Sequence, residues 1–173
     1  LVRKLFVSRN EKSFLEILSG VELFADLKFN VDALIALSSI MREVRFSEGD
    51  YILKEGEEGT EMYILLKGNA AVFKTTPQGD EYKVAILYGD RHAAFGENGL
   101  IESEQRSATI RAETDVECLV LDRKTFEAFS QENPRWAMPI YRKIAHSVMK
   151  RMRKVNNDML LLYNALVEEI RGR

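Results

Sequence analysis

The chain has 173 residues and is 46% apolar, 30% charged and 9% aromatic, the composition of a compact globular domain of ordinary core size. Its 25 basic and 27 acidic side chains leave a formal charge of −2, so we expect no overall basic field that would attract nucleic acid or anionic lipid. No apolar run approaches the roughly twenty residues that a bilayer span needs, and no basic-then-apolar leader opens the sequence. Membrane insertion and secretion are therefore not expected.

The single cysteine, Cys118, cannot form a disulfide within the chain, and its apolar neighbours predict a core residue. His92 and His146 are far apart and show no zinc-ligand spacing, so we expect no metal. These features favour a reducing, cytoplasmic setting. Because the sequence begins at Leu1 rather than Met, we expect a fragment that lacks a neighbouring effector domain.

The first forty residues show a helical pattern of apolar side chains. Leu15 and Leu18, and then Leu34 and Leu37, recur at spacings of three, which predicts two or three short helices. Asn30 is a candidate N-cap for the second of them. We assign residues 1–41 to a helical segment that precedes the main domain.

Turns are concentrated in the middle of the chain, where eight of the ten glycines lie between Gly49 and Gly99. Short runs rich in β-branched and aromatic residues alternate with these turns. The runs are residues 44–46, 51–53, 62–66, 70–75, 82–87, 107–112 and 116–121. Such spacing predicts an antiparallel β-sandwich or β-roll of jelly-roll type over residues 42–132, including a short helix at 124–131. The fold class is therefore mainly β with flanking helices (α+β).

Residues 133–173 predict one long helix, with Pro134 and Pro139 near its start, where a missing N–H costs least. Its apolar residues alternate at steps of four and three, which is typical of a coiled-coil seam and predicts a homodimer through this helix. The alternative is a helix that packs along its own domain. The seam consists of Val148, Met152, Val155, Met159, Leu162 and Leu166.

The stretch from Phe95 to Thr109 places two glycines around a single Glu, with an Arg nine residues beyond that Glu. If residues 97–101 form one helical turn, its first N–H groups lack partners within the helix and form an anion site. Arg106 supplies a planar set of donors that can hold two phosphate oxygens, and the Ser107 hydroxyl can add a contact. Glu97 suits a sugar hydroxyl beside that phosphate. The pattern therefore predicts a nucleotide site.

This stretch resembles the phosphate-binding cassette of cyclic-nucleotide-binding domains, which occur in protein kinase A regulatory subunits, cyclic-nucleotide-gated channels and catabolite-activator-like regulators. The family reads Phe-Gly-Glu, a variable residue, a small residue and Leu, and later Arg-(Ser/Thr/Ala)-Ala, which correspond here to residues 95–100 and 106–108. Upstream, residues 46–59 and 62–68 look like the family's opening strands and turns. The resemblance covers about residues 21–132 and implies a β-roll.

The resemblance also implies a ligand, a cyclic mononucleotide that is either cAMP or cGMP. Glu97 would then bind the ribose 2′-hydroxyl and Arg106 the cyclic phosphate, while N–H groups around Gly99, Leu100 and Ser107 complete the site. The candidate ligand-binding residues are Gly96, Glu97, Asn98, Gly99, Leu100, Arg106, Ser107 and Ala108.

Two positions depart from the family pattern. The family runs from a Gly-Asp turn into Phe-Gly-Glu within two or three residues, whereas here Gly89-Asp90 is followed by residues 91–94 before Phe95. We therefore expect a longer loop. Asn98 stands where the family often has an apolar residue, but both ligand-contacting side chains are present.

In the family, helices after the roll move when ligand binds and place a residue over the purine. The resemblance makes Asn156 and Asn157 candidate base contacts, and Leu160 and Tyr163 candidate lid residues. A segment that contacts ligand in only one of its positions converts binding energy into a population shift.

We therefore predict a soluble regulatory sensor of a cyclic mononucleotide, with no catalytic motif, that signals by moving its C-terminal helix. The alternative is a β-roll that binds no ligand or another ligand and acts as a dimerisation module of a larger regulator. Five basic residues of the last helix, at 143, 150, 151, 153 and 154, favour a solvated face over a surface that steers an anionic partner. Too few residues follow Glu169 for a DNA-reading element, so we expect no direct DNA binding.

Overall fold

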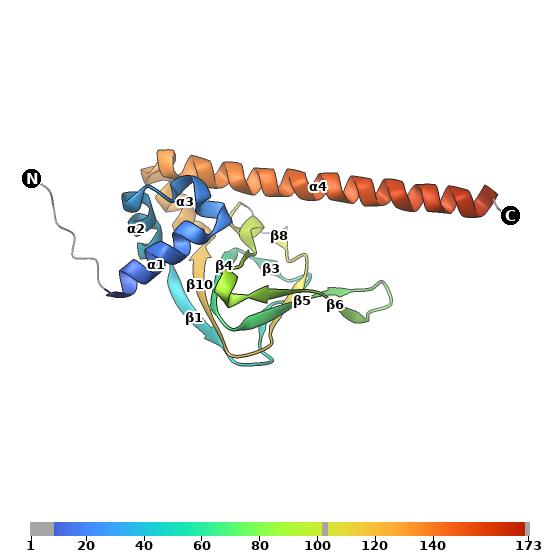
Figure 1. Ribbon diagram of the computed structural model, residues 1–173, viewed down its shortest axis with the longest axis horizontal. Helices are drawn as coiled ribbons and strands as arrows, with labels where there is room; N and C mark the ends of the chain where they lie inside the picture. Colours follow the sequence, from blue (N-terminus) through green and yellow to red (C-terminus); the bar gives the residue numbers. More distant parts are fainter. Residues whose placement is uncertain (1–8, 102–103, 172–173) are drawn as a thin grey trace, which may run out of the picture.

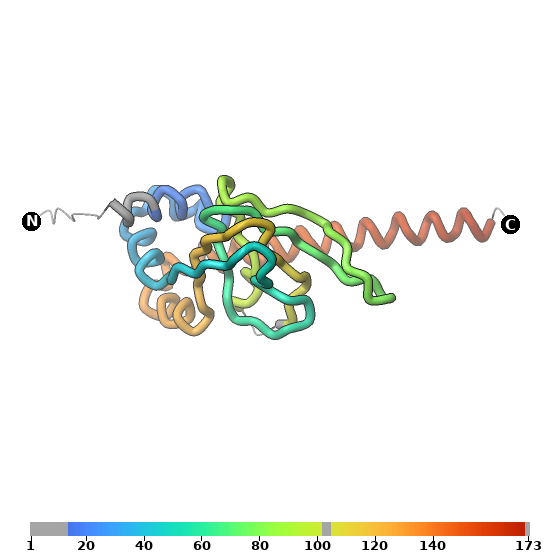
Figure 2. The backbone as a smooth tube through the Cα atoms, turned by 90° about the horizontal axis from the view of Figure 1, so that it is seen from below, coloured from blue at the N-terminus to red at the C-terminus, as the bar shows by residue number. Residues whose placement is uncertain are grey.

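The computed structural model describes residues 9–101 and 104–171 of the chain. Its N-terminal helices are α1 (Arg9–Gly20), the 3-10 helix η1 (Glu22–Leu27) and α2 (Val31–Ser39). The Asn30 side chain accepts a hydrogen bond from the backbone N–H of Ala33 at 3.0 Å, so its predicted role as N-cap of α2 is confirmed. Figure 2 shows that these helices gather at one end of the molecule.

The middle of the described chain contains ten strands, all paired antiparallel. Two four-stranded sheets have the orders β1-β10-β4-β7 and β2-β9-β5-β6, and β3 pairs with β8. The predicted antiparallel β-roll with flanking helices is confirmed. The strands are β1 (Arg42–Phe46), β2 (Tyr51–Leu53), β3 (Glu58–Gly59), β4 (Glu61–Lys67), β5 (Asn69–Thr75), β6 (Glu81–Tyr88), β7 (Ala94–Phe95), β8 (Glu104–Gln105), β9 (Thr109–Ala112) and β10 (Val116–Asp122).

Strand β4 is buried on both faces because it separates two hydrophobic clusters. Successive side chains of a strand point to opposite faces of its sheet. Met62 and Ile64 therefore pack with the helices, whereas Tyr63 and Leu65 face the interior of the roll. Its neighbour β10 divides its side chains between the same two clusters.

Two helices follow the roll. Helix α3 (Arg123–Glu132) begins after Asp122, whose carboxylate accepts from the backbone N–H of Thr125 at 3.2 Å. Helix α4 (Pro134–Arg171) packs on the domain through Ala137, Ile140 and Ile144, and its distal half then extends well beyond the roll (Figure 1). Packing along its own domain is therefore restricted to the first part of this helix.

The segment between β6 and the candidate cassette is an ordered turn. It contains the 3-10 helix η2 (Gly89–Arg91), a left-handed His92 with φ 46° and strand β7. The carbonyl of Ala93 accepts from the backbone N–H of Leu65 on β4 at 2.9 Å. The extra residues of this loop thus form a helical turn. Gly96 alone separates Phe95 from the 3-10 helix η3 (Glu97–Leu100).

Candidate ligand-binding site

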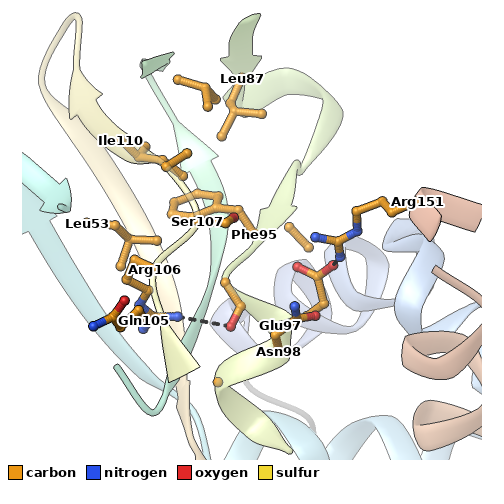
Figure 3. A pocket seen from close by; sticks show the side chains of 15 residues that line it. Leu53, Leu87, Phe95, Glu97, Asn98, Gln105, Arg106, Ser107, Ile110 and Arg151 are labelled. Carbon is orange, nitrogen blue, oxygen red and sulfur yellow. Dashed lines mark hydrogen bonds and ion pairs between the residues drawn. The ribbon is translucent and has the colours of Figure 1, made fainter. Parts of the chain in front are cut away.

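A cavity of about 210 Å³ lies between η3, the segment that follows β8 and the inner face of the roll (Figure 3). Seven of the eight candidate ligand-binding residues line it; the exception, Leu100, is 1% exposed and belongs to the helix-side hydrophobic cluster. Apolar side chains of the roll form another wall. These are Leu53, Val72, Leu87 and Ile110.

The Arg106 guanidinium is held by main-chain carbonyl groups. Its Nη2 donates to the carbonyl of Glu61 at 2.7 Å and its Nη1 donates to the carbonyl of Gly96 at 3.2 Å. Burial lowers the pKa of Arg106 because it disfavours the charged form. Within residues 9–101 and 104–171, no salt bridge joins a carboxylate to this guanidinium. A partly buried, fixed positive charge of this kind is suited to an anionic group in the cavity.

Three glycines leave the space that the Arg106 side chain occupies. A Cβ atom on Gly59 would lie 2.2 Å from Arg106 Nε, and one on Gly99 would lie 3.1 Å from Nη1. Gly96 has φ +76°, and its Cβ would lie 3.0 Å from Nη1. Any larger residue at Gly59 therefore collides with the guanidinium, and a larger one at Gly96 is also strained.

Gly59 reaches Arg106 through backbone pairing between distant segments. The backbone N–H of Gly56 donates to the carbonyl of Arg106 at 2.9 Å, and that of Arg106 donates to the carbonyl of Glu57 at 2.8 Å. The sequence analysis treated Gly59 only as part of an opening turn. It missed this contact because two-residue strands such as β3 and β8 give no periodic signal.

The Glu97 carboxylate lies on the wall of the same cavity as Arg106, at the start of η3. It forms an ion pair with Arg151 of α4, and Figure 3 shows the two side chains meeting at the edge of the cavity. The Glu97 side chain is 20% exposed and that of Arg151 is 50% exposed. The cavity therefore presents a fixed cation, an acceptor and a second cation from the long helix.

The backbone of η3 differs from the expected anion site in one respect. The N–H of Gly99 donates to the carbonyl of Gly96 at 3.0 Å, so this group is used within the 3-10 turn. Asn98 Oδ1 is buried and has no hydrogen-bond partner among the described residues. Asn98 also lines a groove of about 280 Å³ that η3 forms with α4.

Ser107 is fixed through its backbone rather than its hydroxyl. Lys74 of β5 donates to the Ser107 carbonyl and forms an ion pair with Glu55 at 3.1 Å. The side chain of Glu55 in turn accepts from the backbone N–H of Thr75 at 2.9 Å. The sequence did not indicate Lys74 or Glu55, because these contacts join residues 19 to 33 positions apart.

The candidate lid residues of α4 are not at the cavity in this conformation. Asn157, Leu160 and Tyr163 are exposed, and Asn156 lines only the groove beside Asn98. Of the described α4 side chains, the cavity is lined by Arg151 alone, which the sequence analysis placed on a solvated helix face. The seam residues are exposed as well, from 37% at Val148 to 72% at Leu162.

Cys118 is a buried residue of the roll interior, as predicted. Burial raises the pKa of its thiol to about 12. Across the described residues, no three His, Cys, Asp or Glu side chains gather as a metal ion requires. In the same part of the chain, no helix combines the length and apolar character needed to cross a membrane.

Comparison with known proteins assigns the family. The family model described as the cyclic nucleotide-binding domain matches residues 43–133, which is more than half of the chain. The chain belongs to this family, and the resemblance of the cassette is thereby confirmed.

Relatives of the chain include a protein kinase and a protein kinase regulatory subunit. Human cGMP-dependent protein kinase 2 is 36% identical over 127 residues, which are 73% of this chain and 16% of the kinase. The cAMP-dependent protein kinase regulatory subunit of Blastocladiella emersonii is 31% identical over 90 residues, which are 52% of this chain and 22% of the subunit. The chain thus spans less than a quarter of the length of either relative.

Among solved structures, the N-terminal domain of a transcriptional regulator from Streptomyces coelicolor A3(2) is similar to this chain. The two share a TM-score of 0.69 and 29% identity, over 83% of this chain and 94% of that domain.

Proposed function

We propose that this chain is a regulatory module that binds a cyclic purine mononucleotide, cAMP or cGMP, in the cavity beside η3. The observation that supports this most directly is the placement of Arg106 and Glu97 on the wall of one cavity. The Arg106 guanidinium binds the cyclic phosphate, and the Glu97 carboxylate accepts a hydrogen bond from the ribose 2′-hydroxyl. Family membership supports this assignment of the two roles.

The rest of the cavity suits a purine. Leu53, Val72 and Leu87 present apolar side chains to the same space, and burial of a flat aromatic ring against them is favourable. The relatives are named as a cGMP-dependent kinase and a cAMP-dependent kinase regulatory subunit, so both ligands are proposed. Ser107 can bond phosphate and does not by itself distinguish guanine from adenine.

The output of the module is a change in the position of α4. Its distal half is exposed, and Asn156, Asn157, Leu160 and Tyr163 reach a bound base only if α4 moves or a second copy supplies them. A helix that contacts ligand in one position and not in another shifts its population on binding, without catalysis. We propose that any activity under this control lies outside the residues of this chain.

The exposed seam of α4 supports homodimerisation as part of the same proposal. Six apolar side chains at steps of four and three residues are 37–72% exposed in the single chain. They also favour the second candidate function, a dimerisation module whose cavity takes no nucleotide.

Titration calorimetry separates the two functions. We expect saturable binding of cAMP, cGMP or both to the purified chain and no comparable binding of 5′-AMP or 5′-GMP. The Arg106→Ala variant should weaken binding by about 2–5 kcal/mol, or roughly thirty-fold to a few thousand-fold, because the phosphate loses its buried charged partner. No heat with either cyclic nucleotide would favour the dimerisation module, and a change of less than about threefold in Arg106→Ala would reject the role of Arg106.

A further inference from the structure

The ion pair between Glu97 and Arg151 connects the ribose end of the cavity to α4. Arg151 Nη2 donates to Glu97 Oε1 and also contacts Ser147 Oγ at 3.3 Å. In the part of α4 that the structure describes, Arg151 lines the cavity and no other side chain does. The pair is therefore the point at which a ligand and the helix meet.

Helix α4 has little apolar packing on either side of this pair. Nearer its start it is held by Asp26, which accepts from Arg142 at 2.7 Å. Between the two ion pairs the helix covers a second cavity of about 230 Å³, bordered by Leu23, Ala94 and Ile144 among others. Arg151 contacts the roll beyond Ile144, which is the last buried residue of the helix, and we call this contact a latch.

The groove on the other side of Arg151 is also incompletely satisfied. Val148, Met152 and Val155 line it together with Asn98, whose Oδ1 is buried and lacks a donor among the described residues. A buried acceptor without a donor is unfavourable. Val148, Met152 and Val155 are 37%, 60% and 63% exposed, so they add little packing to the Glu97–Arg151 contact that holds α4 in its present position.

We propose that Arg151 competes with the ribose 2′-hydroxyl for the Glu97 carboxylate, and that it thereby determines how strongly the site prefers a ribonucleotide and when α4 is released. This inference rests on the proposed function, because it needs Glu97 to be the acceptor for that hydroxyl. A ligand hydroxyl that takes the place of Arg151 at Glu97 Oε1 weakens the ion pair, so binding and release of α4 are linked. A 2′-deoxy ligand has no hydroxyl to donate to Glu97, so it leaves the ion pair between Glu97 and Arg151 intact.

The direct test is calorimetry with cGMP, cAMP and their 2′-deoxy analogues on three proteins: wild type, Arg151→Gln and Arg153→Gln. Arg153 is a matched control because it is exposed on the same helix, does not line the cavity and, among the described residues, bonds only the Met149 carbonyl. We expect Arg151→Gln to tighten binding of the ribonucleotide by about two- to fivefold, the range for a partly exposed ion pair. Binding of the 2′-deoxy analogue should stay within about 1.5-fold of wild type, so the ribose preference increases.

Other outcomes overturn the inference. Equal gains for the ribose and deoxyribose ligands would show that Arg151 only obstructs the cavity, and weaker ribonucleotide binding would show that it supports the ligand. If wild type binds no cyclic nucleotide, the proposed function fails, but the latch itself is still tested without ligand. Amide hydrogen exchange in residues 147–156 should then be faster in Arg151→Gln than in Arg153→Gln, and equal rates would reject the latch.

Discussion

At the scale of single residues, the site depends on the space around one guanidinium. Arg106 is positioned by two carbonyl groups, from Glu61 and Gly96, and by the absence of side chains at Gly59 and Gly99. The fold itself therefore holds Arg106 in place, which reduces the cost of ordering this side chain when an anion binds.

Gly59→Ala tests this arrangement without removing a charged group. The new Cβ would lie 2.2 Å from Arg106 Nε, and the end of this flexible side chain can move away more cheaply than the backbone can. We therefore expect less than about 1 kcal/mol of lost folding stability but about 1.5–3 kcal/mol of lost ligand binding, the range for a hydrogen bond to a charged group.

Calorimetry and thermal unfolding of the same protein check the two halves of this prediction. Gly20→Ala is the control, because a Cβ there meets nothing within 4 Å. Unchanged affinity in Gly59→Ala would mean that Arg106 need not hold its present position to bind ligand.

Sequence could predict Arg106 and Glu97 because the cassette is local, with both residues in one stretch of regular spacing. It could not predict Gly59 or Arg151 as parts of the site. Gly59 adjoins Arg106, which lies 47 residues later, and Arg151 pairs with Glu97, which lies 54 residues earlier, so both are brought to the site by tertiary contacts. The sequence around a charged residue on a helix does not indicate which distant carboxylate that residue will contact.

At the scale of elements, the first turns of α4 are attached to η1 by the carboxylate of Asp26. The hydrogen bond from Arg142, with help from the nearby charge of Lys143, lowers the pKa of Asp26. A carboxyl whose pKa is lower in the folded state stabilises the fold above its unfolded pKa, about 3.9, and this contribution is lost as pH falls through the folded value.

Asp26→Asn should therefore reduce the acid sensitivity of the chain. We expect the free energy of unfolding, measured with urea at pH 7 and at pH 3, to fall less between these two values in Asp26→Asn than in wild type. Asp158→Asn, in the exposed distal half of α4, is the control. An identical pH dependence in wild type and Asp26→Asn would show that the contact does not contribute to folding in solution.

Strands of three residues or more were predictable, because their side chains alternate or recur often enough to be recognised. Each predicted run from residue 44 to residue 121 overlaps a strand of at least that length. Strands β3, β7 and β8 have two residues each and were missed. Their positions follow from the partners that they pair with rather than from their own sequences.

At the scale of the whole molecule, the exposed half of α4 is the feature on which the proposed dimer rests. Val155 and Leu162 are 63% and 72% exposed, and adding two carboxylates there would oppose burial of the seam. We expect wild type to be a dimer by light scattering and the double variant Val155→Asp with Leu162→Asp to be a monomer.

Asn157→Asp with Asn164→Asp is the matched control for this experiment. It adds the same charge to the same stretch of helix, two residues beyond each seam position. Dimers of unchanged mass in the seam variant, or a monomeric wild type, would remove this helix as the interface.

The two faces of β4 and β10 indicate which residues a shortened version of this chain must keep. Met62, Ile64, Leu119 and Leu121 rest against the helices at the end of the molecule, while the alternate residues of the same strands enclose the roll. A shortened chain that started at residue 42 would remove Leu18, Phe24, Leu34 and Leu37 from the buried hydrophobic cluster to which those four side chains belong. The smallest autonomous folding unit therefore includes the N-terminal helices, although the matched family region begins only at residue 43.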